Sequence, residues 1–109
     1  MFRLCASSAI AEGQSRGLHH GALALLAVRR QGRLYLYRNR CPHRGIALEW
    51  QPDRFLDDSG SLIQCATHGA LFLIENGECV SGPCPGQSLQ PVAFEERDGE
   101  VWLTSPATD

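Results

Sequence analysis

The sequence predicts an all-β fold, and three observations support this class. Short apolar or alternating runs recur along the chain and are separated by turn signals at short intervals, which is typical of all-β proteins. Two of the turns carry the dipeptides Asn76-Gly77 and Asp98-Gly99, which favour tight hairpins. The 109 residues are enough for one hydrophobic core, and we expect a single domain over residues 1–109.

The first half of the chain contains its clearest hairpin. Residues 22–28 are apolar and compatible with a strand, and residues 34–37 follow as a second strand across Gln31-Gly32. The preceding segment, residues 11–21, is expected to be a loop with at most weak strand character.

Shorter strands are expected in the second half. Residues 61–64 form one strand and residues 71–74 the next, and a type I′ turn at Asn76-Gly77 then leads into Cys79. A last hairpin pairs residues 91–95 with residues 100–104, and the tail from Ser105 is expected to be frayed.

Composition and charge exclude several classes of protein. Hydrophobic residues make up 43% and charged residues 20%, which is ordinary for a soluble protein. The net charge of −2 lacks the basic footprint of a nucleic-acid binder. No apolar run approaches the roughly 20 residues that a membrane-spanning helix needs. The N-terminus lacks the order of a secretory signal, so we expect a cytoplasmic protein whose cysteines are metal ligands or buried thiols.

Two short motifs carry the chemistry of the chain. Cys41 and His43 form a Cys-x-His half-site, and Cys65 and His68 form a Cys-x-x-His half-site. Both half-sites fall where a predicted strand passes into a loop, a position that holds ligands rigidly near the surface. Two thiolates with two imidazoles are the ligand set of a Rieske-type [2Fe–2S] centre, in which histidines replace two cysteines on one iron.

Three alternatives to this ligand set fit the sequence less well. Zinc sites with two Cys and two His usually pair like with like, in C-x₂₋₄-C and H-x₃₋₅-H spacings, which the alternation here does not match. Cys79 and Cys84 have the C-x₄-C spacing that opens a plant-type cluster site, but the C-x₂-C that should follow is missing. A metal-free relative of the same fold would be expected to have lost ligands.

The motifs resemble those of the Rieske [2Fe–2S] ferredoxin family, and the resemblance covers about residues 2–104. It implies stacked antiparallel sheets, with the cluster held by two loops at one end and covered by a third, proline-containing loop at residues 81–86. It also implies which residues bind the cluster, the cysteines on an inner iron and the histidines on an outer one: Cys41, Cys65, His43 and His68.

Departures from the respiratory members of this family are informative. Those proteins carry an extra cysteine on each ligand loop, but this chain has Ile46 and Thr67 at the matching positions, so the disulfide clamp is absent. Where they place a serine and a tyrosine as hydrogen-bond donors to the cluster and a ligand sulfur, this chain has Ala70 and Phe72. Fewer donors stabilise the reduced cluster less, so we expect a potential near the low end of the Rieske range, about −150 mV.

Two further groups of residues have more than one interpretation. Cys79 and Cys84 are interpreted as buried thiols, with a redox-active pair as the alternative. Near the first half-site, arginines form either a solvated rim or a docking patch for an acidic partner: Arg38, Arg40 and Arg44. Acidic residues could form a partner face instead, and they are Asp53, Asp57, Asp58, Glu95, Glu96, Asp98 and Glu100.

The resemblance implies a function as a one-electron carrier, non-catalytic by itself and monomeric. An NAD(P)H-dependent flavin reductase would supply the electron, and a terminal oxygenase component, such as that of a ring-hydroxylating dioxygenase system, would receive it. The alternative is a small Rieske-like subunit of a nitrite reductase or of another stable redox enzyme complex, or a redox sensor. A stable subunit would expose an apolar patch in the isolated chain.

Overall fold

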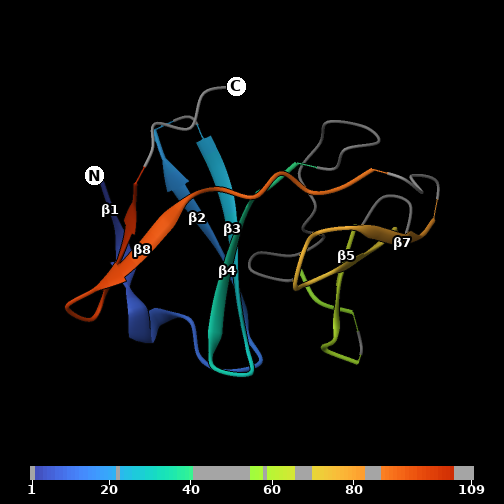
Figure 1. The fold of residues 1–109 in the computed structure, drawn as a ribbon, viewed down its shortest axis with the longest axis horizontal. Helices are drawn as coiled ribbons and strands as arrows, with labels where there is room; N and C mark the ends of the chain where they lie inside the picture. Colours follow the sequence, from blue (N-terminus) through green and yellow to red (C-terminus); the bar gives the residue numbers. More distant parts are fainter. Residues whose placement is uncertain are drawn as a thin grey trace.

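A computed structural model of the protein describes residues 2–21, 23–40, 55–57, 59–65, 70–82 and 87–104. Figure 1 shows its strands as three groups arranged from left to right. In chain order the elements are β1 (Phe2–Ala6), the 3₁₀ turn η1 (Ser7–Ala9), β2 (Ser15–His20), β3 (Leu23–Arg30), β4 (Arg33–Arg38), β5 (Leu62–Gln64), β6 (Leu71–Leu73), β7 (Cys79–Ser81), β8 (Phe94–Arg97) and β9 (Glu100–Leu103).

In the part of the chain that the structure describes, the strands form three antiparallel sheets of three strands each, which confirms the all-β prediction. Their orders are β1-β9-β8, β2-β3-β4 and β5-β6-β7. We call them the outer sheet, the central sheet and the small sheet. Among the described residues, no helix is long and apolar enough to span a bilayer.

The β3–β4 hairpin of the central sheet is buried on both faces. Leu25 and Leu36 point into one core, which the outer sheet covers, while Leu26 and Tyr37 point into a second core against the small sheet. Neighbouring residues of a strand point to opposite faces, so a strand buried on both sides must be apolar at every position. This explains why β3 is apolar without interruption from Leu23 to Val28, before the two arginines at its end.

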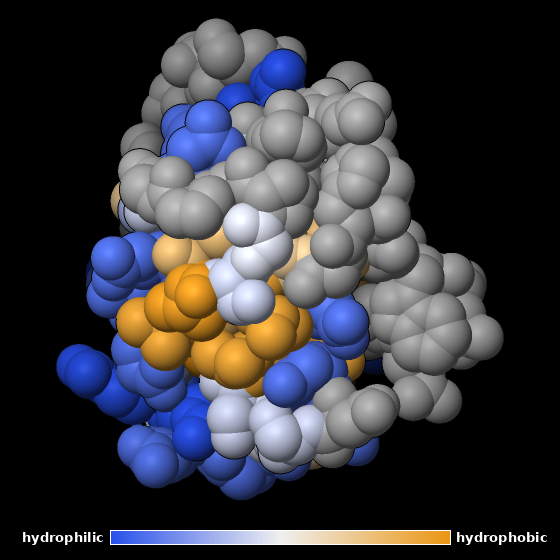
Figure 2. All heavy atoms as spheres, turned by 90° about the vertical axis from the view of Figure 1, so that its right-hand side faces the viewer, coloured by the Kyte–Doolittle hydropathy of each residue, from blue (hydrophilic) through white to orange (hydrophobic). Residues whose placement is uncertain are grey.

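The small sheet is buried on one face only. Ile63 and Phe72 are fully buried beneath it. Alternation places Leu62, Leu71 and Leu73 on the outward face, half-buried, together with Val80, which is 50% exposed. Figure 2 looks onto this side of the molecule and shows apolar atoms gathered there, bordered by hydrophilic ones.

The hairpin predicted in the first half is confirmed. β3 and β4 pair from Arg30–Arg33 back to Leu25–Arg38 across a two-residue turn. Both turn residues have positive φ, 53° at Gln31 and 77° at Gly32, as a type I′ turn requires. The carboxylate of Glu12 accepts both backbone N–H groups of this turn, at 2.6 Å from Gln31 and 2.7 Å from Gly32.

The prediction of a loop over residues 11–21 is wrong, because β2 runs from Ser15 to His20 and pairs with β3 along its length. Its sequence contains one buried apolar residue, Leu18, and is otherwise polar or small. The strand forms because β3 presents a complete edge to it. This tertiary pairing overrides the weak local signal.

The type I′ turn predicted at Asn76-Gly77 is also wrong. Gly77 has a φ of 75°, but Asn76 is not among the described residues with positive φ. The loop is longer, and the Gly77 N–H donates to the Leu73 carbonyl at 2.8 Å. The Asn76 side chain accepts the Glu78 N–H at 2.8 Å, so asparagine stabilises this turn through its side chain and not through its backbone conformation.

The last hairpin is confirmed in its turn and is shorter than predicted on its first strand. Asp98 and Gly99 have φ values of 54° and 77°. Residues 91 and 92 lie outside the hairpin because the chain there runs along the edge of β4, where Pro91 pairs with Tyr37. Ala93 still belongs to it, since its carbonyl accepts the Thr104 N–H at 3.3 Å. We call residues 87–92 the strap; in Figure 1 it belongs to the orange segment that returns from the small sheet to β8.

Replacing Glu12 by Gln should lower the melting temperature at neutral pH by a few degrees. Hydrogen bonds from the Gly32 and Gln31 N–H groups lower the pKa of Glu12. The ionised carboxylate therefore stabilises the fold at pH values above the ordinary pKa of glutamate, and this contribution is lost as the pH falls through the lowered pKa. The measurement is thermal unfolding followed by circular dichroism from neutral to acid pH.

The matched control is Glu95→Gln, which removes an exposed carboxylate that pairs with a neighbouring arginine side chain. The difference between wild type and Glu12→Gln should shrink in acid. A difference of the same size at every pH would show that the charge of Glu12 is not what stabilises the turn.

Candidate metal centre

The first half-site follows the end of β4, and backbone hydrogen bonds hold this strand end in place. The Arg38 N–H donates to the Gln90 carbonyl at 2.9 Å, and the Asn39 N–H donates to the Ala24 carbonyl at 2.9 Å. Asn39 is 8% exposed. Cys41 and His43 lie outside the described residues, so the structure describes the support of this half-site and not its ligands.

The second half-site begins at Cys65, directly after β5. Cys65 is fully buried in the core beneath the small sheet. Its N–H donates to the Ala70 carbonyl at 2.8 Å, which closes the neck of the loop between them. His68 lies within that loop, outside the described residues.

A third segment reaches the same neck from β7. Gly82 has a φ of 102°, and a Cβ there would lie 2.7 Å from the Cα of Ala70. Only glycine allows so close an approach between these two segments of the backbone. On the other side the Cys79 N–H donates to the Gln87 carbonyl at 2.9 Å, so the segment predicted to be the third loop leaves and returns beside the second half-site.

The strap joins the supports of the two half-sites. The Leu89 N–H donates to the Gly77 carbonyl at 2.8 Å, on the side of the small sheet. The Val92 N–H donates to the Leu36 carbonyl at 3.0 Å, on the side of the central sheet. The strap is therefore a strand-like connection between the two sheets from which the predicted half-sites follow.

Several of the predictions for arginine and acidic residues can be compared with the structure. Arg38 is 9% exposed, and its Nη1 lies 3.3 Å from Gln90 Oε1, so the prediction of a solvated rim is wrong for this residue because its side chain packs along the strap. Arg40 is exposed, and Arg44 lies outside the described residues. Acids of the last hairpin form ion pairs within the chain: Glu95 with Arg97, Glu96 with Arg29, and Glu100 with Arg3.

The core next to Cys65 lacks side-chain hydrogen-bond donors at two positions of interest. Ala70 and Phe72 are both fully buried in the same cluster as Cys65. Cys79 is 5% exposed in that cluster, as expected for a buried thiol, and its Sγ donates to the Ser81 carbonyl at 3.4 Å. Cys84 lies outside the described residues.

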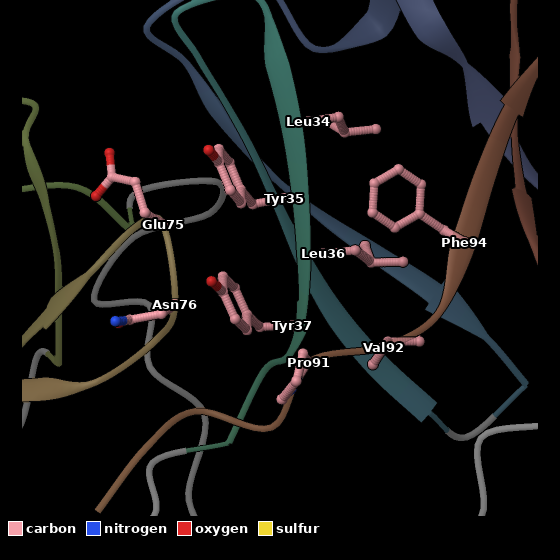
Figure 3. Close-up of a pocket in the computed structure, with 9 residues that line it drawn as sticks. All are labelled: Leu34, Tyr35, Leu36, Tyr37, Glu75, Asn76, Pro91, Val92 and Phe94. Atoms are coloured by element: carbon pink, nitrogen blue, oxygen red, sulfur yellow. The ribbon is translucent and has the colours of Figure 1, made fainter.

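A shallow cleft of about 360 Å³ opens over the outer edge of β4. Figure 3 shows Leu34 and Leu36 on one side of this strand, and Tyr35 and Tyr37 on the other, pointing towards the turn that carries Glu75. Burial raises the pKa of Tyr37 to about 12, with smaller contributions from Tyr35 and Glu75, so its hydroxyl keeps its proton at physiological pH.

The described residues fit a metal centre at this end of the molecule. A fully buried thiol at a loop neck can ionise only if a compensating positive charge is close, and a coordinated metal supplies one. No group of three or more metal-ligating side chains occurs among the described residues, since three of the four predicted ligands lie outside them.

Comparison with known proteins identifies the class. The chain matches the Rieske [2Fe-2S] domain family over residues 1–102 and belongs to that family. The cofactor of the family is the Rieske-type [2Fe–2S] cluster, in agreement with the donor set of the two half-sites.

Individual relatives are more specific. The chain is 31% identical over 102 residues to ferredoxin CarAc of Metapseudomonas resinovorans, covering 93% of this chain and 90% of that protein. A ferredoxin structure from Sphingomonas yanoikuyae B1 superposes with a TM-score of 0.77 at 24% identity, covering 96% of this chain and 98% of that one. A chain in the complex of reduced oxygenase and oxidized ferredoxin in carbazole 1,9a-dioxygenase superposes with a TM-score of 0.75 at 29% identity, covering 94% and 90%.

Some supporting residues were missed by sequence reasoning. The sequence pattern places part of the strap in the last hairpin, and it gives no sign of the contact between Gly82 and Ala70. A glycine directly after a short strand is a signal for close backbone approach, but it does not identify the partner.

The double substitution Ala70→Ser with Phe72→Tyr should raise the reduction potential by tens of millivolts. Both side chains are buried in the core that contains Cys65, and the substitutions would introduce hydroxyl donors at two positions whose side chains have none. Donors near the cluster sulfurs stabilise the reduced form. The measurement is a redox titration of the cluster signal.

Phe94→Tyr is the matched control, because Phe94 is a partly buried phenylalanine in β8 that packs in the other core. It should leave the potential unchanged. If the double variant also showed no upward shift, burial and not hydrogen bonding would set the potential in this protein.

Proposed function

We propose that the protein is a one-electron carrier in which Cys41, His43, Cys65 and His68 hold a Rieske [2Fe–2S] cluster. The observation that carries this proposal is the fully buried Cys65 at the neck of its loop, in a chain of the Rieske family. The cluster, when bound, takes up and releases single electrons. Residues 1–109 would form one domain around it.

The chain's own residues position and shield the cluster in this account. The small sheet and the central sheet each carry one half-site, and the strap joins them. The inner side of the proposed site is lined by three fully buried residues of one apolar cluster: Ala70, Phe72 and Cys65. This apolar lining would keep the cysteine-bound iron away from water. Electrons would therefore pass through the histidine-bound iron, which lies nearer the surface in the family.

The redox partners are inferred from relatives. Ferredoxin CarAc and the ferredoxin in the carbazole 1,9a-dioxygenase complex support a terminal oxygenase component as the electron acceptor. We propose an NAD(P)H-dependent flavin reductase as the donor and the cytoplasm as the location. Such carriers bind their partners weakly and in a salt-sensitive manner through a small patch.

A second candidate function is that of a subunit in a stable redox complex, such as a nitrite reductase. The observation that favours it is the outward face of the small sheet, where Leu62, Leu71, Leu73 and Val80 lie together. Exposed apolar patches mark interaction sites. Purification of the tagged protein from its host at high salt distinguishes the two, because a permanent partner would stay bound and a transient one would be lost.

The ligand assignment is tested by His68→Ala and by His43→Ala. Each variant should lose the Rieske signal in the electron paramagnetic resonance (EPR) spectrum of the reduced protein, because an iron without its imidazole ligand cannot keep the mixed coordination. The measurement is made on anaerobically purified, iron-loaded protein.

His19→Ala is the matched control, since His19 is exposed on β2 in the central sheet. It should keep the full signal. A variant at position 43 or 68 that retained the wild-type spectrum would remove that residue from the site.

A further inference from the structure

The two half-sites are connected to different sheets, and their separation must therefore be set by contacts between those sheets. The first half-site follows β4 of the central sheet, and the second lies between β5 and β6 of the small sheet. A four-ligand centre tolerates little variation in ligand distances. Some interaction has to hold β4 and the small sheet at a constant distance.

Tyr37 makes such an interaction. It lies in β4, four positions before Cys41, and is 3% exposed. Its hydroxyl donates to the carbonyl oxygen of Ile74 at 2.5 Å, in the buried interior. Ile74 follows β6 directly and is fully buried. One side chain therefore joins the strand that leads to the first half-site with the strand that leaves the second.

The turn after β6 is shaped around the Tyr37 ring. A Cβ at Gly77 would lie 3.0 Å from Tyr37 Cε1 and 3.1 Å from Leu89 Cβ, so glycine is needed for the turn to approach. Figure 3 shows the Tyr37 ring pointing towards this turn, above Pro91 of the strap. Tyr37 also pairs with Pro91 through the backbone, so the strap holds the residue from its other side.

We propose that Tyr37 is a positioning residue whose hydroxyl fixes the small sheet against β4 and so sets the spacing of the two half-sites. This inference rests on the proposed ligand assignment. The other interpretation is that the ring fills the core and the hydroxyl only satisfies a buried carbonyl. That interpretation predicts an effect on stability but none on the geometry of the cluster.

The two interpretations are separated by Tyr37→Phe, which keeps the ring and removes the hydroxyl. Without a donor, the buried Ile74 carbonyl would relax towards another partner, and the sheets would lose their common reference. We expect the holoprotein variant to release its cluster to excess EDTA about tenfold faster than wild type, the size expected for loss of one buried hydrogen bond. We also expect broadened or shifted lines in its EPR spectrum.

Tyr35→Phe is the matched control, because Tyr35 projects from the same face of the same strand and packs only at the edge of that core. It should match wild type in both measurements. Gly77→Ala is the second variant, since it displaces the turn while Tyr37 stays intact, and it should shift both measurements in the same direction. It decides the matter if Tyr37→Phe yields no folded protein.

The inference is overturned if Tyr37→Phe melts earlier but keeps the wild-type spectrum and the wild-type rate of cluster release. That result would leave the carrier function intact and make Tyr37 a core residue only. A wild-type protein without a Rieske signal, or a His68→Ala variant that kept one, would overturn the ligand assignment and this inference with it.

Discussion

The burial of the β3–β4 hairpin on both faces is the constraint on which the rest of the structure depends. One face, with Leu25 and Leu36, is covered by the outer sheet, and the other, with Leu26 and Tyr37, is covered by the small sheet. Each apolar face exposed to water would cost on the order of 25 cal/mol per Å². The hairpin therefore requires both neighbours, and the position of the small sheet follows from it.

The proposed cluster site depends on that position. The small sheet supplies the fully buried Cys65 and the β4 end leads to the other half-site, while the strap and the Tyr37 hydroxyl join the two. In the proposed ligand set, which is divided between two sheets, the fully buried Cys65 lies away from water. The weakness of this division is that any relative movement of the sheets changes the ligand distances.

The sequence was sufficient for the fold class, the tight turns at Gln31-Gly32 and Asp98-Gly99, and the family, because turn dipeptides and metal-ligand spacings act locally. It was insufficient for β2, whose strand conformation comes from the edge of β3 and not from its own residues. The position of the strap could not be predicted for the same reason, since its pairing with β4 joins distant parts of the chain. The solvent exposure predicted for Arg38 was wrong because its burial depends on Gln90, a residue far along the sequence.

The most direct test of the central claim is an EPR-monitored redox titration of the anaerobically purified, iron-loaded wild-type protein. The account predicts a Rieske-type signal with a midpoint near the low end of the family's range, about −150 mV. Absence of that signal, with zinc or no metal bound to the protein, would contradict the account of a Rieske electron carrier.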